Sequence, residues 1–310
     1  MPTVLLILII LILIYLVFVA GPAVVGFFSV FKRPKTREPE TTVFEGNYRK
    51  PFEERIKTDS AALRSKDKKR VWITAKDGAR LCADYFDTGS SKTALLLHGY
   101  STGPYLNLSA QALWLLEEGF NVLLIFQRAH LDSGGDRSYL GIKEQYDLLN
   151  WLEYLDKNEK TELILLYGAS MGAATAAFAS DKISSEKVRA MILDSGYTSP
   201  YDQMAYEDKK RHMPSFLLVP IAYLAGRIFL NIDIKVSPEE SLKKTSIPAF
   251  FLHGTEDTTV PIRFGKRNYE ACASEKQCLY IKGANHLMSF MKEEETVKEH
   301  LSSFIQKYMK

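Results

Sequence analysis

The chain has 310 residues, of which 46% are hydrophobic and 25% charged, so it is long enough to bury a sizeable core. Its 40 basic residues nearly balance its 37 acidic ones, and no basic stripe interleaved with aromatic residues occurs, which excludes nucleic acid as an expected partner. The chain has three cysteines, and no two of them have the C-x-x-C spacing of a metal or redox site. We expect reduced, mostly buried thiols, with a Cys272–Cys278 disulfide as the alternative.

The N-terminal segment is apolar without a break from Val4 to Val19, and its apolar character continues to Phe31. About 20 apolar residues cross a bilayer core, and only a helix satisfies the backbone there. We therefore expect a single-pass transmembrane anchor over residues 1–31. A cleaved signal peptide is the alternative, but the chain start carries no basic side chain.

Four basic residues directly follow this segment: Lys32, Arg33, Lys35 and Arg37. By the positive-inside rule they favour a cytoplasmic location for the rest of the chain. Residues 32–65 are polar and interrupted by prolines, which predicts a linker followed by a short helix near Phe52–Leu63.

From about residue 66 to the end, the pattern predicts one α/β domain. Val71–Ala75 and Arg80–Phe86 are typical of two strands joined by an Asp-Gly turn. Short apolar strands then alternate with helices, which indicates a mostly parallel sheet with helices on both faces. The predicted strands are Thr93–Leu97, Asn121–Ile125, Glu162–Tyr167, Val188–Asp194, Ala249–His253 and Gln277–Ile281, and the main helices are Leu106–Glu118, Ile142–Leu155, Gly172–Ser180 and Glu294–Lys307.

The sequence Gly168-Ala169-Ser170-Met171-Gly172 fits the pattern G-x-S-x-G. It follows a predicted strand and precedes a helix of small residues, which is the setting of a nucleophile elbow. A serine hydroxyl needs a base to remove its proton. Ser170 is therefore the candidate nucleophile.

Two later strand ends carry the candidate partners of this serine. Asp257 follows the strand Ala249–His253, and His286 lies in the loop after the next strand. The order serine, acid, histidine fits a catalytic triad with His286 as general base. Glu256 or Asp194 is the alternative acid, and a helix N-cap is the alternative role for Asp257.

The first predicted parallel strand ends in His98-Gly99-Tyr100. The backbone N–H groups of Tyr100 and Met171 are the candidate oxyanion hole, and a plain turn is the alternative. His130, His212 and His253 are scattered in the sequence, and no cluster has metal-ligand spacing. We expect no metal and no cofactor.

Together these motifs, with Val260-Pro261 and Gly283-Ala284-Asn285-His286, resemble the α/β-hydrolase superfamily. The resemblance is strongest to bacterial membrane-anchored serine hydrolases akin to the serine aminopeptidase and prolyl-oligopeptidase branch. Residues 128–135 are similar to that branch's Arg-Gly-His-Gly-x-Ser-x-Gly run, but Ala129 and Leu131 stand where glycines are usual.

Residues 200–245 interrupt the strand–helix alternation and are predicted to form a small helical cap. The apolar stretch Met213–Ile232 within it could pass for a second membrane span. A span there would put Ser170 and His286 on opposite sides of the bilayer, so we reject it.

These features predict a serine hydrolase that cleaves carboxylic esters through an acyl-enzyme intermediate, on small-molecule or lipid-like acyl substrates. A thioesterase or a peptidase of the same fold is the alternative, and a non-catalytic binding scaffold is a further one. The oligomeric state stays open.

Overall fold

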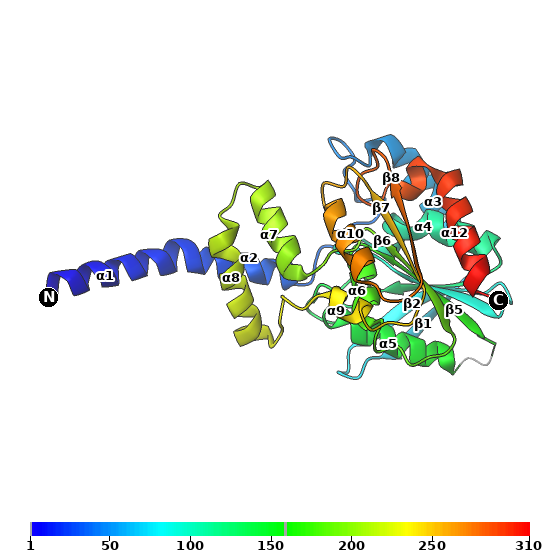
Figure 1. Cartoon of the computed structure of the whole chain (residues 1–310), viewed down its shortest axis with the longest axis horizontal. Helices are drawn as coiled ribbons and strands as arrows, with labels where there is room; N and C mark the ends of the chain where they lie inside the picture. The colour runs from blue at the N-terminus through cyan, green and yellow to red at the C-terminus, as the bar shows by residue number, and fades with distance from the viewer. Residues whose placement is uncertain (1, 158–159) are drawn as a thin grey trace. The chain divides into compact units, whose positions relative to one another are not determined.

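The computed structural model describes residues 2–157 and 160–310, so Met1 of the predicted anchor lies outside the described residues. The chain forms two compact units, which are described separately (Figure 1). The smaller comprises Met1–Lys32 and Ser199–Val236, and the larger comprises Arg33–Thr198 and Ser237–Lys310.

The larger unit is built on an eight-stranded sheet in the order β1-β2-β4-β3-β5-β6-β7-β8. β1 and β2 form an antiparallel hairpin, β2 pairs antiparallel with β4, and all later pairings are parallel. The strands are β1 (Lys69–Thr74), β2 (Arg80–Phe86), β3 (Lys92–Leu97), β4 (Asn121–Phe126), β5 (Leu163–Ala169), β6 (Val188–Asp194), β7 (Ala249–Gly254) and β8 (Lys276–Ile281).

Helices cover both faces of this sheet, as the strand–helix alternation predicts (Figure 1). Successive strand residues point to opposite faces, so neighbours such as Leu123 and Leu124 belong to different core clusters. Trp114 and Phe304 fill one cluster, and Trp151 fills the other. The helices are α3 (Glu53–Ser65), α4 (Pro104–Glu117), α5 (Glu144–Asp156), α6 (Met171–Ala179), α9 (Pro238–Leu242), α10 (Ile262–Ala271), α11 (Ser289–Lys292) and α12 (Glu294–Tyr308).

The smaller unit contains the N-terminal helix and the helices inserted between β6 and β7. The first part runs through α1 (Pro2–Tyr15), a π-helical turn (Leu16–Ala20) and α2 (Gly21–Phe31). Residues Thr3–Phe31 form one apolar helix long enough to cross a membrane. The inserted helices are α7 (Pro200–Lys210), α8 (Ser215–Ala225) and a second π-helical turn (Gly226–Leu230).

A buried ion pair holds the loop that follows β4. The Arg128 guanidinium donates to both carboxylate oxygens of Asp147 on α5, at 2.8 and 2.6 Å, and to Asp77 in the hairpin turn at 2.7 Å. Arg128 and Asp147 are both buried. Burial raises the pKa of Asp147, and the hydrogen bonds and charge of Arg128 oppose that rise. Arg128 therefore connects the loop after β4 to α5 and to the turn between β1 and β2.

Arg128→Met should lower the free energy of unfolding by about 3–5 kcal/mol, because Asp147 would remain as an uncompensated buried carboxylate. Urea unfolding at neutral pH measures this loss. The double variant Arg128→Met/Asp147→Leu should recover much of it, since no buried charge is left. A double variant no more stable than the single one would contradict this account.

Candidate active site

The turn at Ser170 joins β5 to α6 in an unusual backbone conformation. Ser170 has φ 55° and ψ −114°, and its N–H donates to the carbonyl of Asp194 at 2.8 Å. A Cβ at Gly172 would lie 2.0 Å from the carbonyl oxygen of Leu97, and one at Gly168 would lie 2.5 Å from that of Gly172. Only glycine fits at these two positions, which explains the spacing of the motif.

The structure brings Ser170, His286 and Asp257 together at the carboxyl ends of β5, β8 and β7. The Nε2 atom of His286 lies 3.0 Å from the Ser170 hydroxyl, and its Nδ1 atom lies 2.6 Å from Oδ2 of Asp257. All three residues are buried. This is the geometry in which an imidazole can take a proton from the serine.

Asp257 has donors on both carboxylate oxygens. The backbone N–H groups of Thr259 and Val260 donate to Oδ1 at 2.8 and 2.7 Å, and Nε2 of His253 lies 3.3 Å from Oδ2. Burial alone would raise the pKa of Asp257, but attraction to His286 and hydrogen bonds from both histidines outweigh it and hold the pKa below its ordinary value. Asp257 is thus an ionised acceptor for the Nδ1–H of His286.

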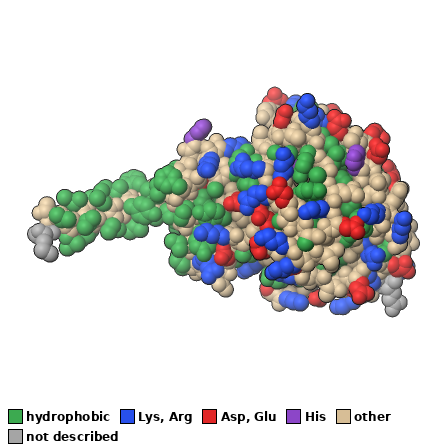
Figure 2. Space-filling model, viewed as in Figure 1, with side chains coloured by type: hydrophobic (Ala, Val, Ile, Leu, Met, Phe, Trp, Pro, Cys, Tyr) green, Lys and Arg blue, Asp and Glu red, His purple; other side chains and the backbone are tan. Residues whose placement is uncertain are grey.

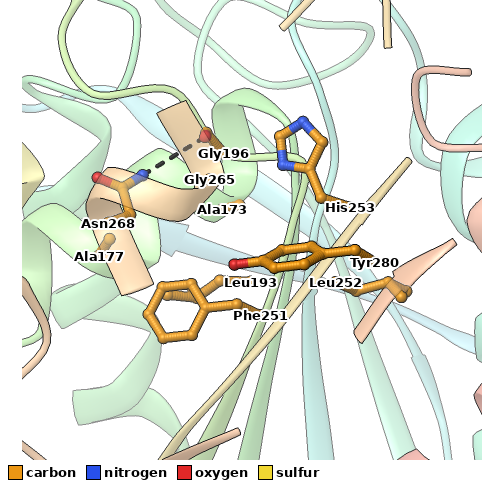
Figure 3. Close-up of a pocket in the computed structure, with 10 residues that line it drawn as sticks. All are labelled: Ala173, Ala177, Leu193, Gly196, Phe251, Leu252, His253, Gly265, Asn268 and Tyr280. Carbon is orange, nitrogen blue, oxygen red and sulfur yellow. Dashed lines mark hydrogen bonds between the residues drawn. The ribbon is translucent and has the colours of Figure 1, made fainter. Parts of the chain in front are cut away.

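His253, which the sequence analysis named only among the scattered histidines, contacts Asp257 directly. Its Nε2 atom also lies 2.9 Å from the carbonyl oxygen of Val260. Figure 3 shows His253 at a small pocket that Gly265, Asn268 and Tyr280 also line. A Cβ at Gly265 would lie 2.3 Å from Nδ1 of His253, so this glycine makes room for the ring. The packing keeps His253 against the carboxylate.

The two alternative acids lie in other surroundings. Glu256 is exposed. Asp194 is fully buried and accepts hydrogen bonds from the hydroxyls of Ser195 at 2.8 Å and Tyr167 at 3.5 Å. Burial raises the pKa of Asp194 from 3.8 to about 6. Asp257 is the carboxylate that contacts His286.

The loop after β3, residues 98–103, lies beside the nucleophile. A Cβ at Gly99 would lie 3.3 Å from the Cβ of Ser170, and the Gly99 N–H donates to Asn107 at 2.8 Å. Tyr100 follows in this loop. Met171 is the first residue of α6, so its N–H has no acceptor within the helix. The two candidate oxyanion donors thus belong to segments that meet at Ser170.

Two buried histidines connect this loop to the loop after β4. Nε2 of His130 accepts from the Ser101 N–H at 3.1 Å, and Nε2 of His98 accepts from the Gln127 N–H at 2.9 Å. Burial lowers the pKa of His130 to about 4 and that of His98 well below its ordinary value. Both rings are therefore neutral and able to accept. No periodic pattern of residues predicts this pairing of the two loops.

The loop after β4 keeps the backbone that glycine favours, although glycine is absent from two positions. Ala129 has φ 61° and Leu131 has φ 46°. The family that the sequence resembles has glycines at these two positions. The substitutions therefore leave the loop conformation unchanged and raise its conformational free energy, because residues with a Cβ are strained at positive φ.

The linker segment, defined as residues 33–38, holds both loops. The Arg33 side chain donates to the carbonyls of Leu131, Ser133 (3.0 Å) and Gly135 (2.9 Å). Arg37 forms a parallel β-bridge with the loop after β3, donating to Ser101 O at 2.9 Å and accepting from Gly103 N–H at 2.8 Å. This segment, predicted to be a linker, therefore holds the two loops that lie beside the candidate active site.

Removing residues 1–38 should speed amide hydrogen exchange in residues 99–104 and 128–136, compared with removing residues 1–32 only. The longer deletion breaks the β-bridge and the Arg33 hydrogen bonds, while both variants lack the N-terminal helix. Exchange measured by mass spectrometry tests this, and equal exchange in the two variants would contradict it. Peptides from α12 are the internal control and should be unchanged.

The raised pKa of Asp194 predicts a pH-dependent stability. Between about pH 4 and pH 6 the folded state keeps a proton that the unfolded carboxyl has released, so this group's contribution falls as pH rises through that window. Asp194→Asn removes the effect. The unfolding free energy of the wild type, minus that of the variant, should fall by about 2–3 kcal/mol across the window. Urea unfolding at both ends measures it, and a constant difference would be the contrary result.

Comparisons with known proteins bear on the fold and on the class of its relatives. No family model matches the chain. The uncharacterized protein YqkD of Bacillus subtilis is 29% identical over 216 residues, covering 69% of this chain and 70% of YqkD. The lysophosphatidylserine lipase ABHD12 of Danio rerio is 26% identical over 166 residues, covering 51% of this chain and 41% of that protein.

Among solved structures, the esterase Pf2001 of Pyrococcus furiosus superposes with a TM-score of 0.67 at 26% sequence identity. The superposition covers 79% of this chain and 93% of the esterase. An esterase of Exiguobacterium antarcticum shares the fold at 20% identity and a TM-score of 0.58. The chain therefore has the α/β-hydrolase fold, and esterases are among its relatives.

Proposed function

We propose that this chain is a serine hydrolase in which Ser170 is the nucleophile, His286 the general base and Asp257 the residue that orients and stabilises the imidazole. The supporting observation is the continuous contact from Ser170 Oγ to His286 Nε2 (3.0 Å) and from His286 Nδ1 to Asp257 Oδ2 (2.6 Å). A serine, a histidine and an acid in one hydrogen-bonded chain are the recurring arrangement for acyl transfer.

The mechanism follows from which atom carries each proton. The ionised Asp257 accepts from Nδ1–H of His286, so Nε2 is free of a proton and accepts the one from the Ser170 hydroxyl. The serine oxygen attacks the acyl carbon, and Asp257 stabilises the imidazolium that forms. His286 then protonates the leaving group, and water releases the acyl group from Ser170 by the same steps.

The negative charge on the tetrahedral intermediate would be held by the backbone N–H groups of Tyr100 and Met171. Two features support this assignment. Met171 opens α6, where helix N–H groups and the helix dipole favour negative charge. Tyr100 follows Gly99, whose backbone lies against Ser170, and His130 fixes the next residue, Ser101. Removal of one such donor typically costs 10²–10³ in rate.

Carboxylic esters are the proposed substrate class, in preference to thioesters or peptides. The supporting comparison is Pf2001, which is an esterase and aligns over 93% of its own length. The zebrafish relative is a lysophosphatidylserine lipase, which extends the class toward lipid-like acyl esters. We further propose that the apolar helix Thr3–Phe31 is a single-pass anchor with the hydrolase domain in the cytoplasm, the basic residues from Lys32 onward setting this orientation.

A fluorophosphonate probe should label the full-length wild type in detergent and leave Ser170→Ala unlabelled. His286→Ala should be labelled far more slowly, because the serine loses its base. Asp257→Asn should lower the turnover of p-nitrophenyl acyl esters by roughly 10⁴-fold through the wrong imidazole tautomer. Circular dichroism checks that each variant is folded.

Two results would overturn parts of this proposal. A folded wild type that the probe does not label would favour a non-catalytic scaffold. Labelling of Ser170, without turnover of any acyl ester but with turnover of acyl thioesters or peptides, would move the substrate to one of those classes.

A further inference from the structure

We propose that α8 and the π-helical turn after it lie flat in the interface of a lipid bilayer, beside the end of the N-terminal helix. The smaller unit would then contact the membrane twice, through one spanning helix and one interfacial helix. The inference rests on the anchoring proposed above and adds a second, independent membrane-binding surface.

The length of the N-terminal helix indicates at which depth of the bilayer this second surface would lie. The apolar helix has 29 residues, Thr3–Phe31. At 1.5 Å per residue it is about 43 Å long, whereas the hydrocarbon core of a bilayer is about 30 Å thick. Roughly the last third of the helix, which corresponds to α2, therefore extends past the core to the level of the lipid headgroups.

The inserted helices pack on this last third. Phe28 on α2 and Phe229 in the π-helical turn have ring centroids 5.7 Å apart. A Cβ at Gly226 would lie 3.5 Å from the ring of Phe27, so the two backbones approach closely. In Figure 1, α8 crosses the line of the N-terminal helix within this unit. A helix that crosses a membrane-spanning one near its end lies along the membrane plane.

The segment from Met213 to Phe229 exposes large apolar side chains toward both of its ends. Phe216 is 76% exposed and Ile228 70% exposed, although a helix this apolar is ordinarily buried. Figure 2 shows apolar side chains over the N-terminal helix and the adjoining cap region. The other exposed large apolar residues of this segment are Met213, Leu217, Leu224 and Phe229.

Polar residues border this apolar surface where headgroups would lie. Lys209 and Lys210 end α7, Arg211 follows two residues before Met213, and all three are exposed. Arg227 is exposed beside Ile228. Basic side chains at the edge of an apolar helix face are typical of helices in the membrane interface. Because the surface continues from the anchor, lipid is the occupant that fits.

Tryptophan fluorescence in full-length protein, reconstituted into phosphatidylcholine–phosphatidylglycerol vesicles, tests the proposal. Phe216→Trp should add a blue-shifted emission that lipids brominated on their acyl chains quench at least two-fold. Tyr146→Trp is the matched control, since Tyr146 is 53% exposed on the hydrolase domain. Its added emission should show little quenching. Fluorophosphonate labelling at the wild-type rate shows that each variant is folded.

A third variant, Leu8→Trp, separates this inference from the anchoring on which it rests. Quenching at Leu8→Trp without quenching at Phe216→Trp would leave the anchor in place and overturn the interfacial helix. An absence of quenching at both positions would overturn both. A blue shift at Phe216→Trp that brominated lipid does not quench would mean that protein, such as a second copy of the chain, covers the surface, and would likewise overturn the proposal.

Discussion

The site depends on a close approach between the backbones of α6 and β3, which leaves no room for a side chain at Gly172. The start of α6 approaches the end of β3 so closely that a Cβ at Gly172 would overlap the carbonyl oxygen of Leu97. This approach sets the turn that holds Ser170 at positive φ, and it brings Gly99 to the same point. The nucleophile, the loop after β3 and the first N–H of α6 therefore converge because glycine at position 172 lets the start of α6 approach the end of β3.

Two carboxyl groups at neighbouring strand ends show how their surroundings shift the pKa of the same kind of side chain in opposite directions. Asp257, after β7, receives backbone and imidazole donors and stays ionised. Burial raises the pKa of Asp194, at the end of β6, to about 6, although the hydrogen bond from the Ser195 hydroxyl opposes that rise. Burial lowers the pKa of His98 and of His130, so these two rings act instead as neutral acceptors of backbone N–H groups and fix loops.

The sequence predicted the fold well because strand–helix alternation and the glycines around Ser170 are local signals. The antiparallel β1–β2 hairpin followed from its Asp-Gly turn for the same reason. The strand order of the sheet is not local, and neither are the supports of the site. Arg37 pairs with Ser101, 64 positions away, and the room for the His253 ring is left by Gly265 on α10. A polar, proline-containing segment such as 33–38 gives no sign of its partner, so it was predicted to be only a linker.

The surplus length of the proposed membrane anchor would couple the position of α8 to the thickness of the bilayer. Its 29 residues form a helix longer than an average hydrocarbon core is thick, and α8 and the π-helical turn after it pack against the C-terminal part of that helix. Thicker membranes would take in more of α2 and draw α8 toward the acyl chains, while thinner ones would leave it among the headgroups or tilt the helix. Bilayer thickness would thus tune the depth of the cap, through hydrophobic mismatch, without any change in the hydrolase domain.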